Sequence, residues 1–96
     1  MKQPIKVFQQ AFKAHQAGAF KEAEELYRKV LHQHPGHPAS HRLLGTLLAQ
    51  QGDYMAAEQP LRQALLLDPN DAETNNNLGI ICSETERLDE AIACYE

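Results

Sequence analysis

Apolar residues recur along this chain every three or four positions, a spacing that places them on one face of an α-helix. Glycine and proline interrupt the pattern at short intervals, so each predicted helix is about a dozen residues long. The regularly spaced apolar residues are Tyr27, Leu31, Leu44, Leu48, Leu61, Leu65, Leu78 and Tyr95. We expect them to form a continuous core between neighbouring helices of an all-α protein.

The same pattern repeats after 34 positions, because Pro35 recurs as Pro69, Gly18 as Gly52 and Gly45 as Gly79. A period of this length is typical of stacked helix-turn-helix units, each of which buries an apolar face against the next. We therefore predict a single domain over residues 1–96, with units at 4–37 and 38–71 and a truncated third unit at 72–96. Since the third unit stops in mid-pattern, we expect the chain to be a piece of a longer protein.

Glycine and short polar residues mark where these helices begin and end. Gly18 and Gly52 are expected to terminate the first helices of their units in the left-handed conformation, which glycine adopts without steric cost. Asp53 is placed to cap the helix that follows it. In the third unit, Asn70 and Glu73 have the spacing of a capping box, with Asn70 as the cap.

Two residues break the local rules. Pro60 lies inside a predicted second helix, where its ring clashes with the carbonyl group of Ala56 and removes a hydrogen bond. We expect a kink there, absorbed on the outer, convex face of the array. Glu86 stands where the other units have the turn glycine, so we expect the loosest turn at that point.

Small residues occupy matching places in the paired helices of each unit. The three in the first helices and the three in the second helices are Ala11, Gly45 and Gly79, facing Ala23, Ala57 and Ala91. They allow two antiparallel helices to approach near the lower limit of about 8–10 Å between their axes. Larger side chains would wedge each pair apart.

Taken together, these positions carry the motif of a known repeat. The second unit contains Leu44-Gly45, Leu48, Gly52-Asp53-Tyr54, Ala57, Leu61, Ala64-Leu65 and Asp68-Pro69; the third has Asn77-Leu78-Gly79, Leu88, Ala91 and Tyr95; the first, a weaker copy, has Ala11, Gly18, Phe20, Ala23, Tyr27, Leu31 and Pro35. Over essentially its whole length the chain resembles the tetratricopeptide repeat family. The resemblance implies a right-handed superhelix of antiparallel helix-turn-helix repeats, whose first helices line a concave wall where ligand peptides usually lie.

On that wall the resemblance points to five partner-binding residues, which are Phe8, Phe12, Arg42, Asn76 and Asn77. Phe8 and Phe12 are four residues apart and so share a helix face. Aromatic and arginine side chains dominate binding energy at protein interfaces. Two interpretations of the phenylalanine pair stay open: exposed anchors for a partner, or a pair that packs the first helix onto its own unit or against a neighbouring copy.

Two familiar binding modes of the family fit this sequence poorly. Chaperone-binding repeats that grip an acidic peptide tail resemble one another in placing lysine and asparagine where Phe8 and Phe12 stand, so we do not expect a carboxylate clamp. Asn77 matches the asparagine ladder of O-linked N-acetylglucosamine transferases. Gln9 and Leu43 occupy the equivalent places in the other units, which leaves one rung of such a ladder.

Histidine and cysteine are the remaining candidates for chemistry. Four histidines lie close together, at His32, His34, His37 and His41, and imidazoles at short spacing can bind zinc or nickel. Because three convergent ligands are needed and prolines restrict this segment, we expect a solvated loop between units and no metal. Cys82 and Cys94 lack the close pairing of a zinc site, so we expect reduced, buried thiols.

Charge and motif content exclude several classes of function. The net charge is −4 with no basic block, which argues against nucleic acid as a partner. No apolar run is long enough to span a membrane and no secretion signal is evident, so we expect a cytoplasmic protein. Phosphate-binding, nucleophile-elbow and zinc-protease motifs are absent, so we expect neither a cofactor nor enzymatic activity.

The predicted function is that of a protein–protein interaction scaffold, which binds a peptide or protein segment on the concave face of the array. One alternative is self-association into a homo-oligomer through uncapped repeat ends, because the truncated third unit is expected to leave Ile81, Ile92 and Tyr95 poorly covered. Another is substrate recruitment at the N-terminal end of a larger enzyme. The sequence looks similar to repeat regions that precede bacterial glycosyltransferase or sulfotransferase domains.

Overall fold

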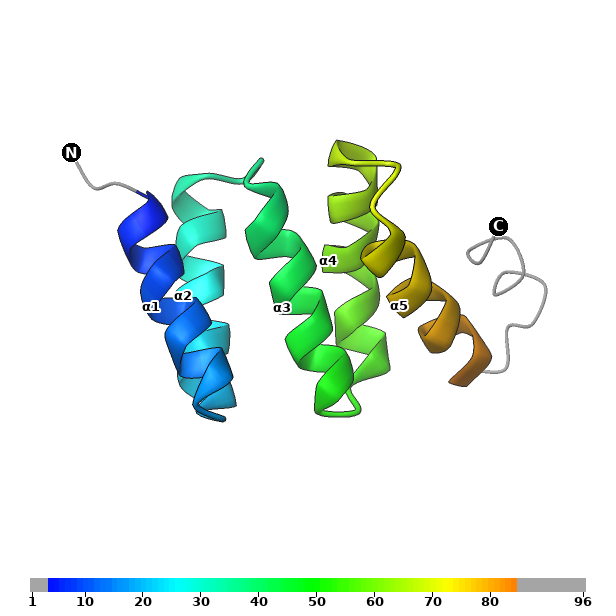
Figure 1. Cartoon of the computed structure of the whole chain (residues 1–96), viewed down its shortest axis with the longest axis horizontal. Helices are drawn as coiled ribbons and strands as arrows, with labels where there is room; N and C mark the ends of the chain where they lie inside the picture. Colours follow the sequence, from blue (N-terminus) through cyan, green and yellow to red (C-terminus); the bar gives the residue numbers. More distant parts are fainter. Residues whose placement is uncertain (1–3, 85–96) are drawn as a thin grey trace.

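Five α-helices follow one another in the computed structural model, which describes residues 4–84 (Figure 1). They are α1 (Pro4–Gln16), α2 (Phe20–Gln33), α3 (Pro38–Gln50), α4 (Tyr54–Leu67) and α5 (Ala72–Glu84). Residues 4–84 contain no strand. The prediction of an all-α chain is confirmed.

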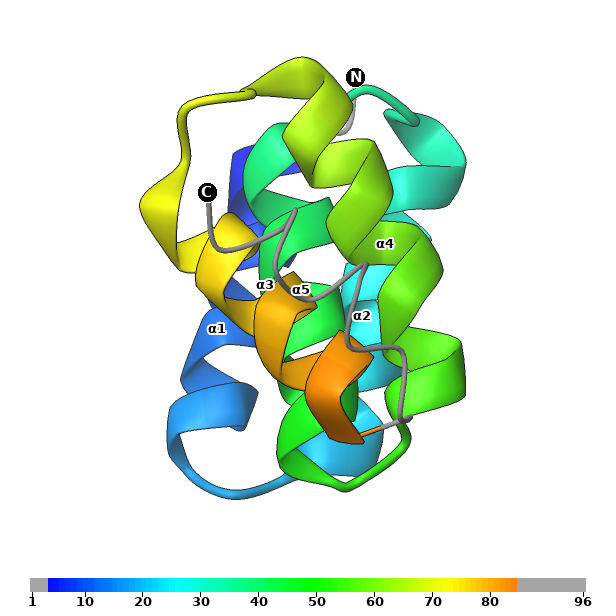
Figure 2. The same ribbon diagram turned by 90° about the vertical axis from the view of Figure 1, so that its right-hand side faces the viewer.

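The helices pair into antiparallel hairpins that stack side by side. α1 packs on α2 and α3 packs on α4, while contacts of α2 with α3 and of α4 with α5 join successive hairpins. Figures 1 and 2 show two layers, with α1, α3 and α5 on one side and α2 and α4 on the other. Within the first layer α3 also contacts α5. One side of this layer therefore remains uncovered by α2 and α4.

The turns inside the two hairpins have the predicted geometry. Gly18 and Gly52 have φ angles of 81° and 80°, in the left-handed region that a side chain would disfavour. The Asp53 side chain accepts a hydrogen bond from the backbone N–H of Ala56 at 3.3 Å and so caps α4, as expected. Pro38 is the first residue of α3, where its missing N–H has no helical partner to lose.

At the start of α5 the expected capping residue was wrong by one position. The helix begins at Ala72, and the cap is Asp71, not Asn70. Asp71 Oδ1 accepts from the Glu73 backbone N–H at 3.2 Å, and Asp71 Oδ2 accepts from the Thr74 hydroxyl at 2.7 Å. A carboxylate at this place also faces the positive end of the helix dipole, which a neutral asparagine would exploit less well.

The core runs through both hairpins at the positions that the repeat pattern predicts. Tyr27, Leu61 and Leu78 are completely buried, and so are the small residues Ala11 and Ala23 where α1 meets α2. These contacts remove apolar surface from water, which stabilises the folded state by roughly 25 cal/mol for each Å² buried. Burial of this continuous set holds neighbouring hairpins in register.

Gly45 marks the closest approach between α3 and α4. A Cβ atom at this position would lie 2.7 Å from Leu61 Cδ2 and 3.2 Å from the carbonyl oxygen of Ala57. The first distance is shorter than normal contacts of a Cβ atom and the second is tighter than most, so Leu61 would have to move. The pairing of small residues at this crossing is confirmed.

The α4 helix continues through Pro60 without interruption. Pro60 is buried, so it lies on the core side of α4 and not on the outer surface where we expected the bend to be absorbed. The kink itself stays a prediction.

Near the end of the described chain, Ile81 is wholly buried, which corrects the expectation that it is poorly covered. Cys82 is buried, as expected. The expectations for Glu86, Ala91, Ile92, Cys94 and Tyr95 concern residues outside the described range 4–84.

We predict that Gly45→Ala lowers the free energy of unfolding by about 1–3 kcal/mol, because the added methyl group overpacks the α3–α4 crossing. In an open helix the same change would stabilise by up to about 1 kcal/mol. Urea unfolding followed by circular dichroism measures the difference. Gly36→Ala is the control, because nothing lies within 4 Å of a Cβ added there. Equal stability of Gly45→Ala and the wild type would contradict the packing argument.

Candidate functional site

The uncovered side of the α1–α3–α5 layer carries the residues expected to bind a partner. We call it the first-helix face, and its members are Ile5, Phe8, Phe12, Arg42, Thr46, Gln50, Glu73, Asn76, Asn77 and Ile80. Three large apolar side chains on it are open to solvent, with exposed fractions of 57% for Ile5, 41% for Phe12 and 39% for Ile80. Phe12, Thr46 and Ile80 occupy equivalent positions in successive repeats.

The phenylalanine pair divides between the two interpretations left open by the sequence. Phe8 is half-buried, and its ring centroid lies 6.1 Å from that of Tyr27 and 5.1 Å from that of His37. Phe12 stacks on Phe8 at 6.5 Å with an angle of 12° between the rings. Phe8 therefore packs α1 onto its surroundings, while Phe12 rests on Phe8 and presents its outer side to solvent.

A buried tyrosine and a histidine connect the first two hairpins. His15 Nε2 lies 2.7 Å from Gln50 Oε1, and His15 Nδ1 lies 3.0 Å from the hydroxyl oxygen of Tyr27. An amide oxygen can only accept, so Nε2 carries the hydrogen, and in the neutral ring Nδ1 then accepts from the Tyr27 hydroxyl. Burial raises the pKa of Tyr27 to about 12, which keeps that hydroxyl a donor.

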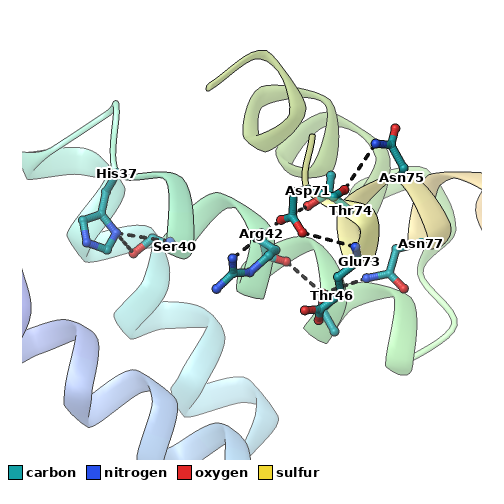
Figure 3. Close-up of polar contacts among 9 residues, drawn as sticks. All are labelled: His37, Ser40, Arg42, Thr46, Asp71, Glu73, Thr74, Asn75 and Asn77. Atoms are coloured by element: carbon teal, nitrogen blue, oxygen red, sulfur yellow. Dashed lines mark hydrogen bonds and ion pairs between the residues drawn. The ribbon is translucent and has the colours of Figure 1, made fainter. Parts of the chain in front are cut away.

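Polar contacts also connect α3 to α5 on the first-helix face, as Figure 3 shows. Asn77 Nδ2 donates to the hydroxyl of Thr46 at 3.1 Å, and that hydroxyl donates to the backbone carbonyl of Arg42 at 2.9 Å. The Arg42 Nη1 atom lies 3.6 Å from Asp71 Oδ2. Arg42 Nε is buried and has no hydrogen-bond partner among the described residues. Two predicted binding residues thus take part in contacts between neighbouring first helices: Asn77 of α5 bonds to α3, and Arg42 of α3 contacts the residue that caps α5.

Asp71 is the centre of this link and stays ionised. Desolvation by itself raises the pKa of Asp71, but the hydrogen bond from Thr74, the charge of Arg42 and the N–H groups at the start of α5 outweigh it. The net effect is a pKa below the ordinary value for aspartate. One carboxylate therefore caps α5 and holds Arg42 at the same time.

A histidine performs the same capping role at the start of α3. His37 Nδ1 accepts from the backbone N–H of Ser40 at 3.2 Å and lies 2.8 Å from the Ser40 hydroxyl oxygen (Figure 3). Burial lowers the pKa of His37, and the nearby His34 and His41 lower it further. The neutral ring is the form that can accept at Nδ1.

The histidine stretch does not converge on a metal geometry. His41 Nε2 donates to the carbonyl oxygen of Pro35 at 2.6 Å, while His37 uses Nδ1 for its cap. From residue 4 to residue 84, no three histidine, cysteine, aspartate or glutamate side chains are grouped so that they could hold a metal ion.

The five candidate residues therefore differ in their exposure and in their contacts. Phe12 and Asn76 are exposed, and Phe8 is half-buried. Arg42 contacts the residue that caps α5, and Asn77 bonds to α3. Their role in binding stays a prediction. Sequence reasoning missed the linking roles of Gln50 and Asp71, because their partners His15 and Arg42 lie 35 and 29 positions away in the chain.

A shallow groove of about 680 Å³ lies elsewhere, along α1 and α2 on the side away from α3. Its lining includes Gln10, Lys13 and Ala14. The equivalent positions in the next repeat are Leu44, Leu47 and Leu48, all buried. Gln10 and Lys13 thus place polar side chains where the next repeat has buried leucines, and the groove is separate from the first-helix face.

Comparisons with known proteins match this architecture. A family model for the tetratricopeptide repeat matches residues 14–73 and, in overlap, residues 48–96. Cellulose synthase operon protein C of Xanthomonas axonopodis pv. citri (strain 306) is 36% identical over 88 residues, which are 92% of this chain and 6% of that protein. The chain thus spans a small part of that relative.

Solved structures agree on the fold. A MamA double mutant (RS-1 ArsTM) superposes with a TM-score of 0.90 at 24% identity, over 95% of this chain and 51% of that one. The second TPR of Spaghetti (RPAP3), bound to the HSP90 peptide SRMEEVD, superposes with a TM-score of 0.91 at 19% identity, over 98% of this chain and 87% of that one.

The chain therefore belongs to the tetratricopeptide repeat family. Its fold is the right-handed superhelical array that the sequence predicts. Among the described residues no helix is both long enough and apolar enough to cross a membrane.

We predict that Asp71→Ala lowers the free energy of unfolding by about 0.5–2 kcal/mol, because it removes the cap of α5. Asn70→Ala is the matched control and should leave stability unchanged, since α5 takes its cap from Asp71. Urea unfolding of both variants measures the difference. An equal loss in the two would restore Asn70 as the capping residue.

We predict that the protein loses stability as the pH falls from about 7.5 to about 5. The folded state lowers the pKa of His37, so below the ordinary histidine pKa of about 6.5 the unfolded chain binds more protons than the folded one. His37→Asn keeps an acceptor for the Ser40 N–H and should reduce this dependence. Unfolding midpoints in urea at the two pH values provide the measurement, and an unchanged dependence in His37→Asn would contradict the assignment.

Proposed function

We propose that this chain is a non-catalytic docking module that binds a peptide or protein segment on the first-helix face. The observation that carries the proposal is the placement of Phe12. This aromatic ring is exposed, yet it stacks on Phe8, which in turn contacts Tyr27 and His37. Exposed aromatic side chains in fixed positions are the usual anchors of protein interfaces.

Contacts between repeats support preorganisation of this face. His15 and Gln50 join α1 to α3, and Asn77 and Thr46 join α5 to α3. The relative positions of the three first helices are therefore set before a partner arrives. Little conformational entropy is then lost on the protein side when binding occurs.

The five candidate residues would have different roles. Phe12 and Asn76, which are exposed, would contact the partner directly, and Phe8 would support Phe12. Arg42 and Asn77 would form a polar wall, and their contacts with Asp71 and Thr46 would hold this wall in place. The solved repeat of Spaghetti (RPAP3) holds a short HSP90 peptide, which supports peptide binding by an array of this size. Because Phe8 and Phe12 replace the clamp residues, we do not propose an acidic tail as the partner.

The non-catalytic assignment has its own support. Ser40 and His37 form a hydroxyl–imidazole contact, which is the arrangement that a nucleophile needs. Ser40 is completely buried, however, and the ring nitrogen also accepts from the backbone. The contact is a helix cap that no substrate could reach.

A second candidate function is recruitment within a larger protein. The identity of 36% to a stretch that makes up 6% of Cellulose synthase operon protein C favours it. In that setting the same first-helix face would bind a substrate or partner for another part of the protein. Self-association is supported less, because Ile81 is buried.

We predict that peptides selected by this protein from a random phage-displayed library bind through Phe12. Phe12→Ala should weaken their binding about tenfold or more, because truncating an anchor residue typically costs more than about 1 kcal/mol. Leu66→Ala is the matched control, since Leu66 is 74% exposed but lies on α4 in the other layer. Fluorescence anisotropy gives the affinities, and circular dichroism checks that both variants keep their helix content. Binding that survives in Phe12→Ala, or is lost in Leu66→Ala, would move the site away from the first-helix face.

A further inference from the structure

We infer that the partner is an extended segment with two large apolar side chains six residues apart and a lysine or arginine next to the one that lies on α5. This inference rests on the proposed function and specifies its partner. Its starting point is the pair of exposed apolar side chains at equivalent positions of the first and third repeats, Phe12 on α1 and Ile80 on α5.

The spacing follows from the stacking of the hairpins. Phe12 and Ile80 are separated by two steps from one first helix to the next. Helices that pack directly on each other lie about 8–10 Å apart, and successive first helices, which α2 and α4 also join, are spaced at least that far, so the two anchors lie roughly 20 Å apart. An extended chain advances about 3.3 Å per residue, so about six residues span this distance. Side chains of an extended segment alternate between its two sides, and an even separation places both apolar side chains toward the protein.

The position between the two anchors is polar. Thr46 is the equivalent of Phe12 and Ile80 on α3, and its hydroxyl is shared with Asn77 and the Arg42 carbonyl. Gln50 lies one turn further along α3 and is exposed. The residues of the segment that cross α3 should therefore be small or polar. A large apolar side chain would remove water from these groups and offer no hydrogen bonds in exchange.

Charge distinguishes the two ends of the segment. Glu73 and Glu84 are exposed and lie seven residues before and four residues after Ile80, so they flank it on the same face of α5. The α5 sequence contains no lysine, arginine or histidine. On α1 the corresponding places beside Phe12 are Ile5 and Gln16, which carry no charge. A basic side chain is therefore favoured only beside the apolar residue that lies on α5.

Synthetic fluorescein-labelled peptides test the pattern directly. The reference probe has a phenylalanine and a leucine six positions apart, a lysine beside the leucine, and serine and glycine elsewhere. A second probe moves the leucine one position closer, which turns it to the opposite side of the strand. A third probe replaces the lysine by glutamate. We expect the second probe to bind about tenfold more weakly than the reference, because it loses one anchor. We expect the third to bind about two- to fivefold more weakly than the reference at low salt.

Protein variants identify the groups that read the charge. Replacing both flanking acids, Glu73→Gln with Glu84→Gln, should abolish the preference for lysine over glutamate in the probe. The matched control changes two exposed acids on α2, Glu22→Gln with Glu25→Gln, and removes the same net charge from the other layer. The preference for lysine should persist in this control.

Failure of the inference and failure of the proposed function give different results. If the reference and shifted probes bind equally well and both need Phe12, the first-helix face binds peptides but the two-anchor spacing is wrong. If the flanking-acid variant keeps the preference for lysine, the assignment of charge to α5 is wrong. If no probe and no library-selected peptide binds in a manner that depends on Phe12, both the inference and the proposed function are overturned.

Discussion

The close approach of paired helices at small residues is the constraint on which the rest of this structure depends. At Gly45 the backbone of α3 lies so near Leu61 and Ala57 that an added Cβ atom would force Leu61 to shift. That approach makes each hairpin a thin, two-layered unit, and thin units can stack with their first helices on one side. Without it, α1, α3 and α5 would not share a face, and no surface would exist on which an extended segment could cross three helices.

Polar contacts then convert a stack of hairpins into a surface of defined shape. Asp71 caps α5 and contacts Arg42 of α3, while His37 caps α3 and contacts Phe8 of α1. In both places a residue that caps the start of one first helix also contacts a side chain of the preceding first helix. The helix caps and the first-helix face are therefore coupled, and loss of a cap would also disturb the face.

Individual residues show how far the sequence leads toward the candidate site. The four-residue spacing of Phe8 and Phe12 does not predict which of the two is exposed, because both positions lie at the edge of the buried face of α1. The answer depends on Tyr27 and His37, which lie 19 and 29 positions beyond Phe8. Arg42 was expected on the face, but its contact with Asp71 required the orientation of α5.

By itself, the sequence determined the period, the helical hairpins, the turn glycines and the crossing of small residues. These features follow from backbone preferences and apolar spacing over a few residues, so the local sequence around Gly18, Gly45 and Gly52 is enough to predict them. Only the tertiary structure decided that Asp71 caps α5 in place of Asn70, that Ile81 is buried, and that Arg42, Asn77 and Gln50 bind residues outside their own helices. A side chain at the edge of the buried face of its helix contacts residues of other helices. Which residues these are depends on how whole helices pack together.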